Sequence, residues 1–236
     1  MKIKQLFTLS AALFMVFPVF ANDYPISHPT AEYTDSVGVV RSMNEGSSLS
    51  EQAPLTIQFK ANPENTAGFT MNYKWSIYLK EATEPDIVNY EENFELTLSH
   101  ANTYTVILTT TYTDSDGNQE TKDSNPLIIT IIESFLSFPN AFSPNGDGIN
   151  ERFQAKSYQS IVEFSAAIYN RWGQKLYSWT DPKDGWDGTF NGKPVKQGVY
   201  FVNVKAKGAD GHEYHIRRDV NLLRGYTESS GSSNNY

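Results

Sequence analysis

Apolar and polar side chains alternate along several segments of the chain, and this period of two limits the fold more than any other feature. Successive side chains of a strand point to opposite faces, so alternation indicates a strand with one buried face. The alternating or β-branched segments of the first half are 55–59, 73–80, 94–98, 104–109 and 127–132. Turn signals at 62–65, 114–117 and 125–126 separate them, and no stretch carries a convincing helical period. Several short strands between turns predict a β-sandwich.

The second half continues in the same way. Strands are expected at 161–169, 174–179, 198–207 and 213–223. Asn170–Gly173 predicts a hairpin between the first two, and the Asp-Gly pair within Gly208–Gly211 predicts a hairpin between the last two. The fold class is therefore predicted as all-β, with consecutive sandwich domains at 53–133 and 134–226.

The first 21 residues have the layout of a cleaved signal peptide. Lys2 and Lys4 precede an apolar stretch from Leu6 to Phe20, and Val19-Phe20-Ala21 forms a cleavage site of the A-x-A kind. The stretch is shorter than the ~20 apolar residues that a spanning helix needs. An uncleaved N-terminal anchor is the alternative interpretation.

Two further segments lack a strand pattern. Residues 22–52 are rich in Ser, Pro and acidic residues, which predicts an extended lead-in with one edge strand at 37–41. Residues 227–236 are rich in Ser, Gly and Asn, which predicts a disordered tail. The chain has no cysteine, so no disulfide or thiolate chemistry is available and each domain depends on its core alone.

Charge is unevenly divided between the two halves. Residues 22–133 contain 5 basic against 17 acidic residues, a net charge of −12. Residues 134–226 contain 12 basic against 9 acidic residues, a net charge of +3. The acidic half repels nucleic acid and anionic lipid, and it either attracts a basic partner or cations or simply keeps the protein soluble.

The first predicted sandwich resembles PKD-type and other immunoglobulin-like modules of bacterial surface proteins. The residues that carry this resemblance are Tyr73-Lys74-Trp75 and Ala101-Asn102-Thr103-Tyr104-Thr105-Val106. Trp75 is expected in the core and Tyr104 at the corner where its strand begins. The fold expectation is thus two consecutive Ig-like β-sandwich domains after a cleaved signal peptide.

The second domain resembles the type B C-terminal sorting domain of the type IX secretion system, also called the gliding-motility-associated C-terminal domain, over residues 138–225. Four blocks in order carry the resemblance: Pro139–Asn150, Ile168–Gly173, Gly185–Lys193 and Gln197–Phe201, with Val220–Arg224 closing the domain. The sorting-motif residues are Asn145, Gly146, Asp147, Gly148, Asn150, Asn170, Arg171, Trp172, Gly173, Trp186, Asp187, Gly188, Gly198 and Tyr200. Glu151 stands where the family usually has the shorter acid, and this chain extends past the final strand.

This resemblance implies a route and partners. The family occurs in Bacteroidota, and its domain directs a periplasmic protein through an outer-membrane translocon to the cell surface. Type B domains are similar in pairing with outer-membrane proteins of the PorP/SprF kind. Only one small sandwich precedes the domain here, a layout that resembles a small protein associated with the secretion machinery and its signalling. No transmembrane span and no nucleic-acid partner are expected.

The loop 144–151 contains oxygen-bearing side chains of the kind that bind metal ions. Asn145, Asp147, Asn150 and Glu151 offer oxygen donors for a weak Ca²⁺ site, but the full calcium-loop spacing is missing. Self-capped Asx turns explain the same residues and are the favoured interpretation. Trp186 is expected to plug the end of the sandwich and Asp187 to bond nearby backbone amides.

Function is left between three classes. No catalytic or phosphate-binding motif occurs, so a non-enzymatic binding protein is favoured over a hydrolase. Arg171, Trp172 and Trp186 are candidates for recognition, although aromatic residues in small sandwiches usually belong to the core. An adhesin or glycan-binding cargo is the alternative, with Tyr73, Tyr78, Tyr90 and Tyr112 as candidate contacts.

Overall fold

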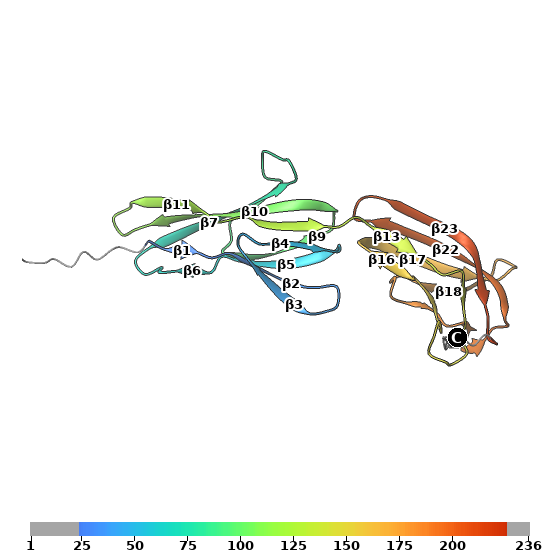
Figure 1. Cartoon of the computed structure of the whole chain (residues 1–236). Coiled ribbons are helices and arrows are strands. Elements are labelled where there is room, and N and C mark those ends of the chain that lie inside the picture. The colour runs from blue at the N-terminus through green and yellow to red at the C-terminus, as the bar shows by residue number, and fades with distance from the viewer. Residues whose placement is uncertain (1–23, 226–236) are drawn as a thin grey trace, which may run out of the picture.

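The structure is a computed structural model that describes residues 24–225, and in this range it contains strands and no helix. The all-β prediction is confirmed. The signal peptide predicted at 1–21 and the tail predicted at 227–236 lie outside the described residues. Two domains lie end to end, each with a core of its own (Figure 1).

The first domain is a sandwich of two sheets. One sheet has the order β3 (Val40–Asn44), β2 (Thr30–Thr34), β5 (Leu55–Lys60) and β9 (Asn93–Leu98). The other has the order β4 (Ser48–Glu51), β12 (Leu127–Ile131), β10 (Asn102–Thr113), β7 (Thr70–Leu79) and β8 (Ile87–Asn89), and β11 (Gln119–Asp123) pairs with the second half of β10. A short ribbon joins β1 (Ile26–Ser27) to β6 (Pro63–Glu64).

Alternation places the core of this domain where the sequence predicts it. Trp75 is fully buried and packs against Phe59 and Phe94, with ring centroids 5.7 and 5.6 Å away. Tyr104 donates its hydroxyl to the carbonyl of His100 at 2.8 Å, four residues upstream. This bond is the tyrosine corner of immunoglobulin-like sandwiches, so both aromatic predictions are confirmed.

The structure differs from the extended lead-in predicted for 22–52. Residues 30–51 instead supply β2, β3 and β4, and β4 pairs in parallel with β12. The edge strand predicted at 37–41 is shifted, because 35–39 form a hairpin turn and β3 begins at Val40. In β2 and β3 only Ala31 and Met43 are buried, so these strands show no apolar alternation in the sequence.

The second domain has one continuous sheet and one broken layer. The sheet has the order β14 (Ala141–Phe142), β23 (Glu213–Leu222), β22 (Gly198–Gly208), β17 (Ile161–Tyr169) and β18 (Lys175–Trp179). Three ribbons form the rest: β13 (Phe135–Ser137) with β16 (Ser157–Gln159), β15 (Phe153–Gln154) with β19 (Gly185–Trp186), and β20 (Thr189–Phe190) with β21 (Lys193–Pro194). Both predicted hairpins are confirmed.

Contacts between the domains gather at the β22–β23 turn. The Ala101 amide donates to the carbonyl of Ala209 at 2.9 Å, and Ala209 packs in the core of the first domain. The Ala53 amide donates to the hydroxyl of buried Ser160 at 3.2 Å. Asp210 accepts the amide and hydroxyl of Ser134, at 3.1 and 2.8 Å. Hydrogen bonds therefore hold the junction between the two domains.

Candidate functional site

Most of the sorting blocks meet at the end of the second domain that lies opposite this junction. β22 runs from that end, at Gly198, to the junction, at Gly208. At a rise of ~3.3 Å per residue the two ends are ~33 Å apart. We call this far end the distal end, defined by Pro144, Gly188, Val195, Gln197 and Arg224.

Arg224 joins the segments of the distal end. Its guanidinium donates through Nε to the Val195 carbonyl at 3.1 Å, through Nη1 to the Pro144 carbonyl at 3.1 Å and through Nη2 to the Gly188 carbonyl at 2.7 Å. Its backbone amide donates to the side chain of Gln197 at 3.2 Å. One side chain just after β23 thus joins the loop at Pro144 to both ends of the β20–β21 ribbon, at Gly188 and Val195.

Gly188 satisfies two independent demands at this point. Its φ is +76°, a conformation that glycine adopts without strain and other residues rarely adopt. A Cβ there would lie 3.0 Å from the Leu222 side chain and from Arg224, and 3.1 Å from Pro144. The close packing around the guanidinium therefore requires glycine.

The loop between Pro144 and Glu151 is closed by its own side chains. Asp147 Oδ1 accepts the Ile149 amide at 2.8 Å, and Asp147 Oδ2 accepts the side-chain amide of Asn145 at 2.9 Å. Glu151 Oε1 accepts the amides of Gly146 and Gly148 at 2.8 and 3.1 Å. The bond from Asn145, followed by that from the Ile149 amide, holds the pKa of Asp147 below its ordinary value.

These bonds bear on the calcium interpretation. A calcium ion takes about 6–8 oxygen ligands, and here the carboxylates of Asp147 and Glu151 are turned toward amide donors of the loop. Within residues 24–225, no three His, Asp or Glu side chains come together in a geometry that could hold a metal ion. The geometry fits the self-capped Asx turns, with Asn150 in the left-handed conformation at φ +53°.

Aromatic packing fills the domain behind the distal end. Trp186 is fully buried, donates its Nε1 hydrogen to the Thr189 carbonyl at 2.7 Å and packs against Tyr200 at 5.0 Å between centroids. Asp187 Oδ1 accepts the amide and hydroxyl of Thr189, so the roles expected for Trp186 and Asp187 are confirmed. Tyr200 donates to the Lys196 carbonyl at 2.6 Å, a second tyrosine corner that the sequence reasoning missed.

Trp172 differs from the core position usual for an aromatic residue. It lies in the turn of the β17–β18 hairpin with 76% of its surface exposed, and the Arg171 guanidinium lies 4.5 Å from its ring centroid. Asn170 caps the turn by accepting the amides of Trp172 and Gln174, both at 3.0 Å. Arg171 and Trp172 are therefore accessible to a partner, whereas Trp186 is not.

Sequence reasoning also missed how the arginines of this domain are used. Arg218 donates through Nη2 to the carbonyls of Phe138 and Pro139, which ties the first sorting block to β23. Arg152 donates through Nε to the Gly185 carbonyl at 3.2 Å. These acceptors are main-chain carbonyls, which every residue has, so the sequence carries no signal for the pairing.

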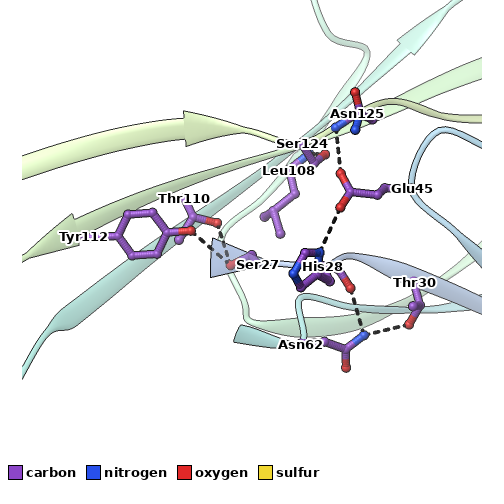
Figure 2. Close-up of polar contacts among 10 residues, drawn as sticks. All are labelled: Ser27, His28, Thr30, Glu45, Asn62, Leu108, Thr110, Tyr112, Ser124 and Asn125. Atoms are coloured by element: carbon purple, nitrogen blue, oxygen red, sulfur yellow. Dashed lines mark hydrogen bonds and ion pairs between the residues drawn. The ribbon is translucent and has the colours of Figure 1, made fainter. Parts of the chain in front are cut away.

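A different polar cluster lies at the N-terminal strands of the first domain (Figure 2). His28 Nδ1 lies 3.2 Å from Glu45 Oε1, and Glu45 Oε2 accepts the Asn125 amide at 2.9 Å. The Ser27 hydroxyl instead accepts the hydroxyl of Thr110 at 3.2 Å, on the side away from the imidazole. The cluster ties β1 and the loop after β3 to the loop before β12.

The comparisons with known proteins identify the second domain. Residues 136–216, about a third of the chain, match the CHU_C type IX secretion signal domain family. No curated protein matches the sequence. No helix within residues 24–225 has the length and apolar character needed to cross a bilayer.

Solved structures with partial similarity come from several sources. The fibronectin(III)-like modules of CbhA from Clostridium thermocellum share 14% identity at a TM-score of 0.22, over 76% of this chain and 90% of theirs. Latent PorU from Porphyromonas gingivalis shares 12% identity at a TM-score of 0.26, over 86% of this chain and 20% of its own.

The FN1–FN3 domains of chicken CNTN1 share 9% identity at a TM-score of 0.31, over 83% of this chain and 89% of theirs. At these TM-scores nothing about this chain is inferred from the three structures. The family match stands on its own: residues 136–216 form a type IX secretion signal domain, and the chain that carries it is a type IX cargo exported to the cell surface.

Proposed function

We propose that this chain is a non-enzymatic surface protein whose second domain docks on the outer-membrane secretion machinery while its first domain is displayed. The observation that carries the proposal is the distal end, where Arg224 joins the first sorting block, at Pro144, to the third, at Gly188, and to the adjacent Val195. The distal end lies opposite the domain junction, so a receptor can hold it without contacting the acidic first domain.

The partners of the second domain in this proposal are the type IX translocon and an outer-membrane protein of the PorP/SprF kind. In its finer form the proposal makes the chain an accessory or signalling component of that machinery. The net charge of −12 over 22–133 keeps the displayed domain away from anionic headgroups and available to a basic partner.

A non-enzymatic role agrees with how the conspicuous polar groups are used. In the first domain, Glu45 bonds to His28 and to the backbone of Asn125, which ties loops together. In the second domain, Asp147 and Glu151 accept loop amides. Each of these groups has a structural partner that explains its position.

The alternative is a small adhesin or glycan-binding cargo, which needs an exposed aromatic platform. Of the four candidate tyrosines, Tyr112 is buried, Tyr73 and Tyr78 are half-buried, and Tyr90 is 71% exposed. A single exposed ring is a poor glycan platform, so the docking role is favoured.

Deleting residues 138–236 tests the proposal. We expect the truncated protein to accumulate in the periplasm of the producing bacterium, while the full chain reaches the surface and is degraded by protease added to intact cells. Recovery of the truncated form at the surface would refute the proposed role of the second domain.

A further inference from the structure

A groove of about 680 Å³ opens beside the β17–β18 hairpin at the distal end. The hairpin turn forms one wall, and the segment from Lys196 to Phe201 forms the other. Three apolar side chains at this groove are strongly exposed: Trp172 by 76%, Val199 by 50% and Phe201 by 45%. Exposed apolar groups gathered at a concave place on the surface are typical of a protein interaction site.

The hairpin presents Trp172 in a fixed position. The Gly173 amide donates to the Asn170 carbonyl and the Asn170 amide to the Gln174 carbonyl, both at 3.0 Å, and Gly173 has φ +78°. This is a turn closed by a glycine bulge, with both flanking strands in the sheet. Because the backbone that carries Trp172 is already ordered, binding through this residue does not have to order the turn.

The charge of the groove restricts what it can receive. Arg171 and Lys196 are the charged residues that line it, and no Asp or Glu lies among its lining residues. Neither cation takes part in any of the ion pairs found between residues 24 and 225. Both therefore remain available for a carboxylate brought by a partner.

We propose that this groove receives an acidic segment of a partner protein, with an apolar side chain seated against Trp172 and Phe201 and carboxylates paired with Arg171 and Lys196. The inference rests on the proposed function, because it specifies the surface through which the second domain docks. Phe201 and Val199 lie on β22 beside the projecting hairpin, so the apolar surface is concave. A concave surface can receive an inserted side chain, whereas a flat bilayer would contact only its rim.

Tryptophan fluorescence of the full chain provides a direct test. Trp75 and Trp186 are fully buried and Trp179 is 5% exposed, so acrylamide quenching reports chiefly on Trp172. The probe is a synthetic peptide of one phenylalanine flanked by two glutamates on each side. We expect it to protect Trp172 from quenching, and Arg171→Glu and Lys196→Glu each to weaken its binding by ~10-fold, in a salt-dependent manner.

Two matched peptides identify what the groove selects. Replacing the four glutamates by lysines tests charge, and replacing the phenylalanine by serine tests the apolar anchor. Equal protection by all three peptides, or none by the first, would overturn the proposal. Sedimentation of the chain alone tests whether a second copy of the chain fills the groove. Self-association that is lost in Trp172→Ser would also overturn the proposal.

In cells, the full chain carrying Trp172→Ser and Arg171→Glu should be released from the surface or retained in the periplasm, with unchanged thermal unfolding of the purified protein. Tyr90→Ser is the matched control, because it removes an aromatic side chain exposed by 71% from the other domain. If the groove variant stays on the surface while deletion of 138–236 abolishes display, the groove inference fails and the proposed function stands. If that deletion also leaves display intact, the proposed function itself fails.

Discussion

Replacing Arg224 by alanine removes the side chain that joins the distal end. Three hydrogen bonds are lost, at 3.1, 3.1 and 2.7 Å, and the carbonyls of Val195, Pro144 and Gly188 lose a charged donor. A net value of ~1 kcal/mol for each bond applies here, because water can reach the half-buried site and replace part of each interaction. We therefore expect the second domain to lose ~3 kcal/mol of unfolding free energy.

Such a loss is large enough to measure by calorimetry. For a domain of this size ~1 kcal/mol lowers the melting temperature by ~4–8 °C, so the transition of the second domain should fall by ~12–24 °C. The transition of the first domain should stay in place. Hydrogen exchange of the amides in β22 and β23 assigns the change to the correct domain.

Two variants serve as controls for this prediction. Arg217→Ala removes an arginine from the exposed outer face of β23, where no hydrogen bond or ion pair of residues 24–225 involves its side chain, and should leave the transition unchanged. Arg224→Lys keeps the charge but loses the planar fork that reaches three acceptors, so an intermediate loss is expected. If the second domain melts at the same temperature in Arg224→Ala and in Arg217→Ala, the reasoning about the distal end is refuted.

Three other predictions follow from the same domain. Gly188→Ala should destabilise the second domain by ~2 kcal/mol or more. Gly146 has φ +86° but open space where a Cβ would be added, so Gly146→Ala should cost only the ~1 kcal/mol of the left-handed conformation. Equal losses of unfolding free energy in urea denaturation would contradict the packing argument. The pKa of Asp147 is lowered in the folded protein, so the contribution of its carboxylate to loop stability is complete above the ordinary pKa of 3.8 and is lost as the pH falls through the folded pKa. A pKa of Asp147 at or above 3.8, measured by NMR titration, would contradict this. Tyr200→Phe should cost ~1–2 kcal/mol by loss of the bond to the Lys196 carbonyl, and an unchanged denaturation midpoint would show that the corner bond is not stabilising.

The sequence predicted those parts of the fold in which one residue's environment is decided by its neighbours in the chain. Alternation located β5, β7, β9 and β10, because one face of each strand packs on the core, and a β-branched run located β12. It failed for β2 to β4, where few side chains are buried and pairing is decided by the backbone of other strands.

The candidate site divides in the same way. Turns such as Asn170–Gly173 were predictable, since glycine and a capping Asn stand within four residues of each other. The role of Arg224 was not, because its acceptors are carbonyl groups up to 80 residues away. The exposure of Trp172 also depends on tertiary packing, which leaves a turn residue projecting from the sheet.

The central claim is that the second domain contains the address that the secretion machinery reads. Its most direct test places residues 134–236 after a signal peptide and a small inert reporter, and measures protease access to the reporter on intact cells. The account predicts that the reporter reaches the surface and that its display is reduced when Arg224 is replaced by alanine in the fusion. A reporter that stays in the periplasm, in a fusion whose second domain is folded, would contradict the claim.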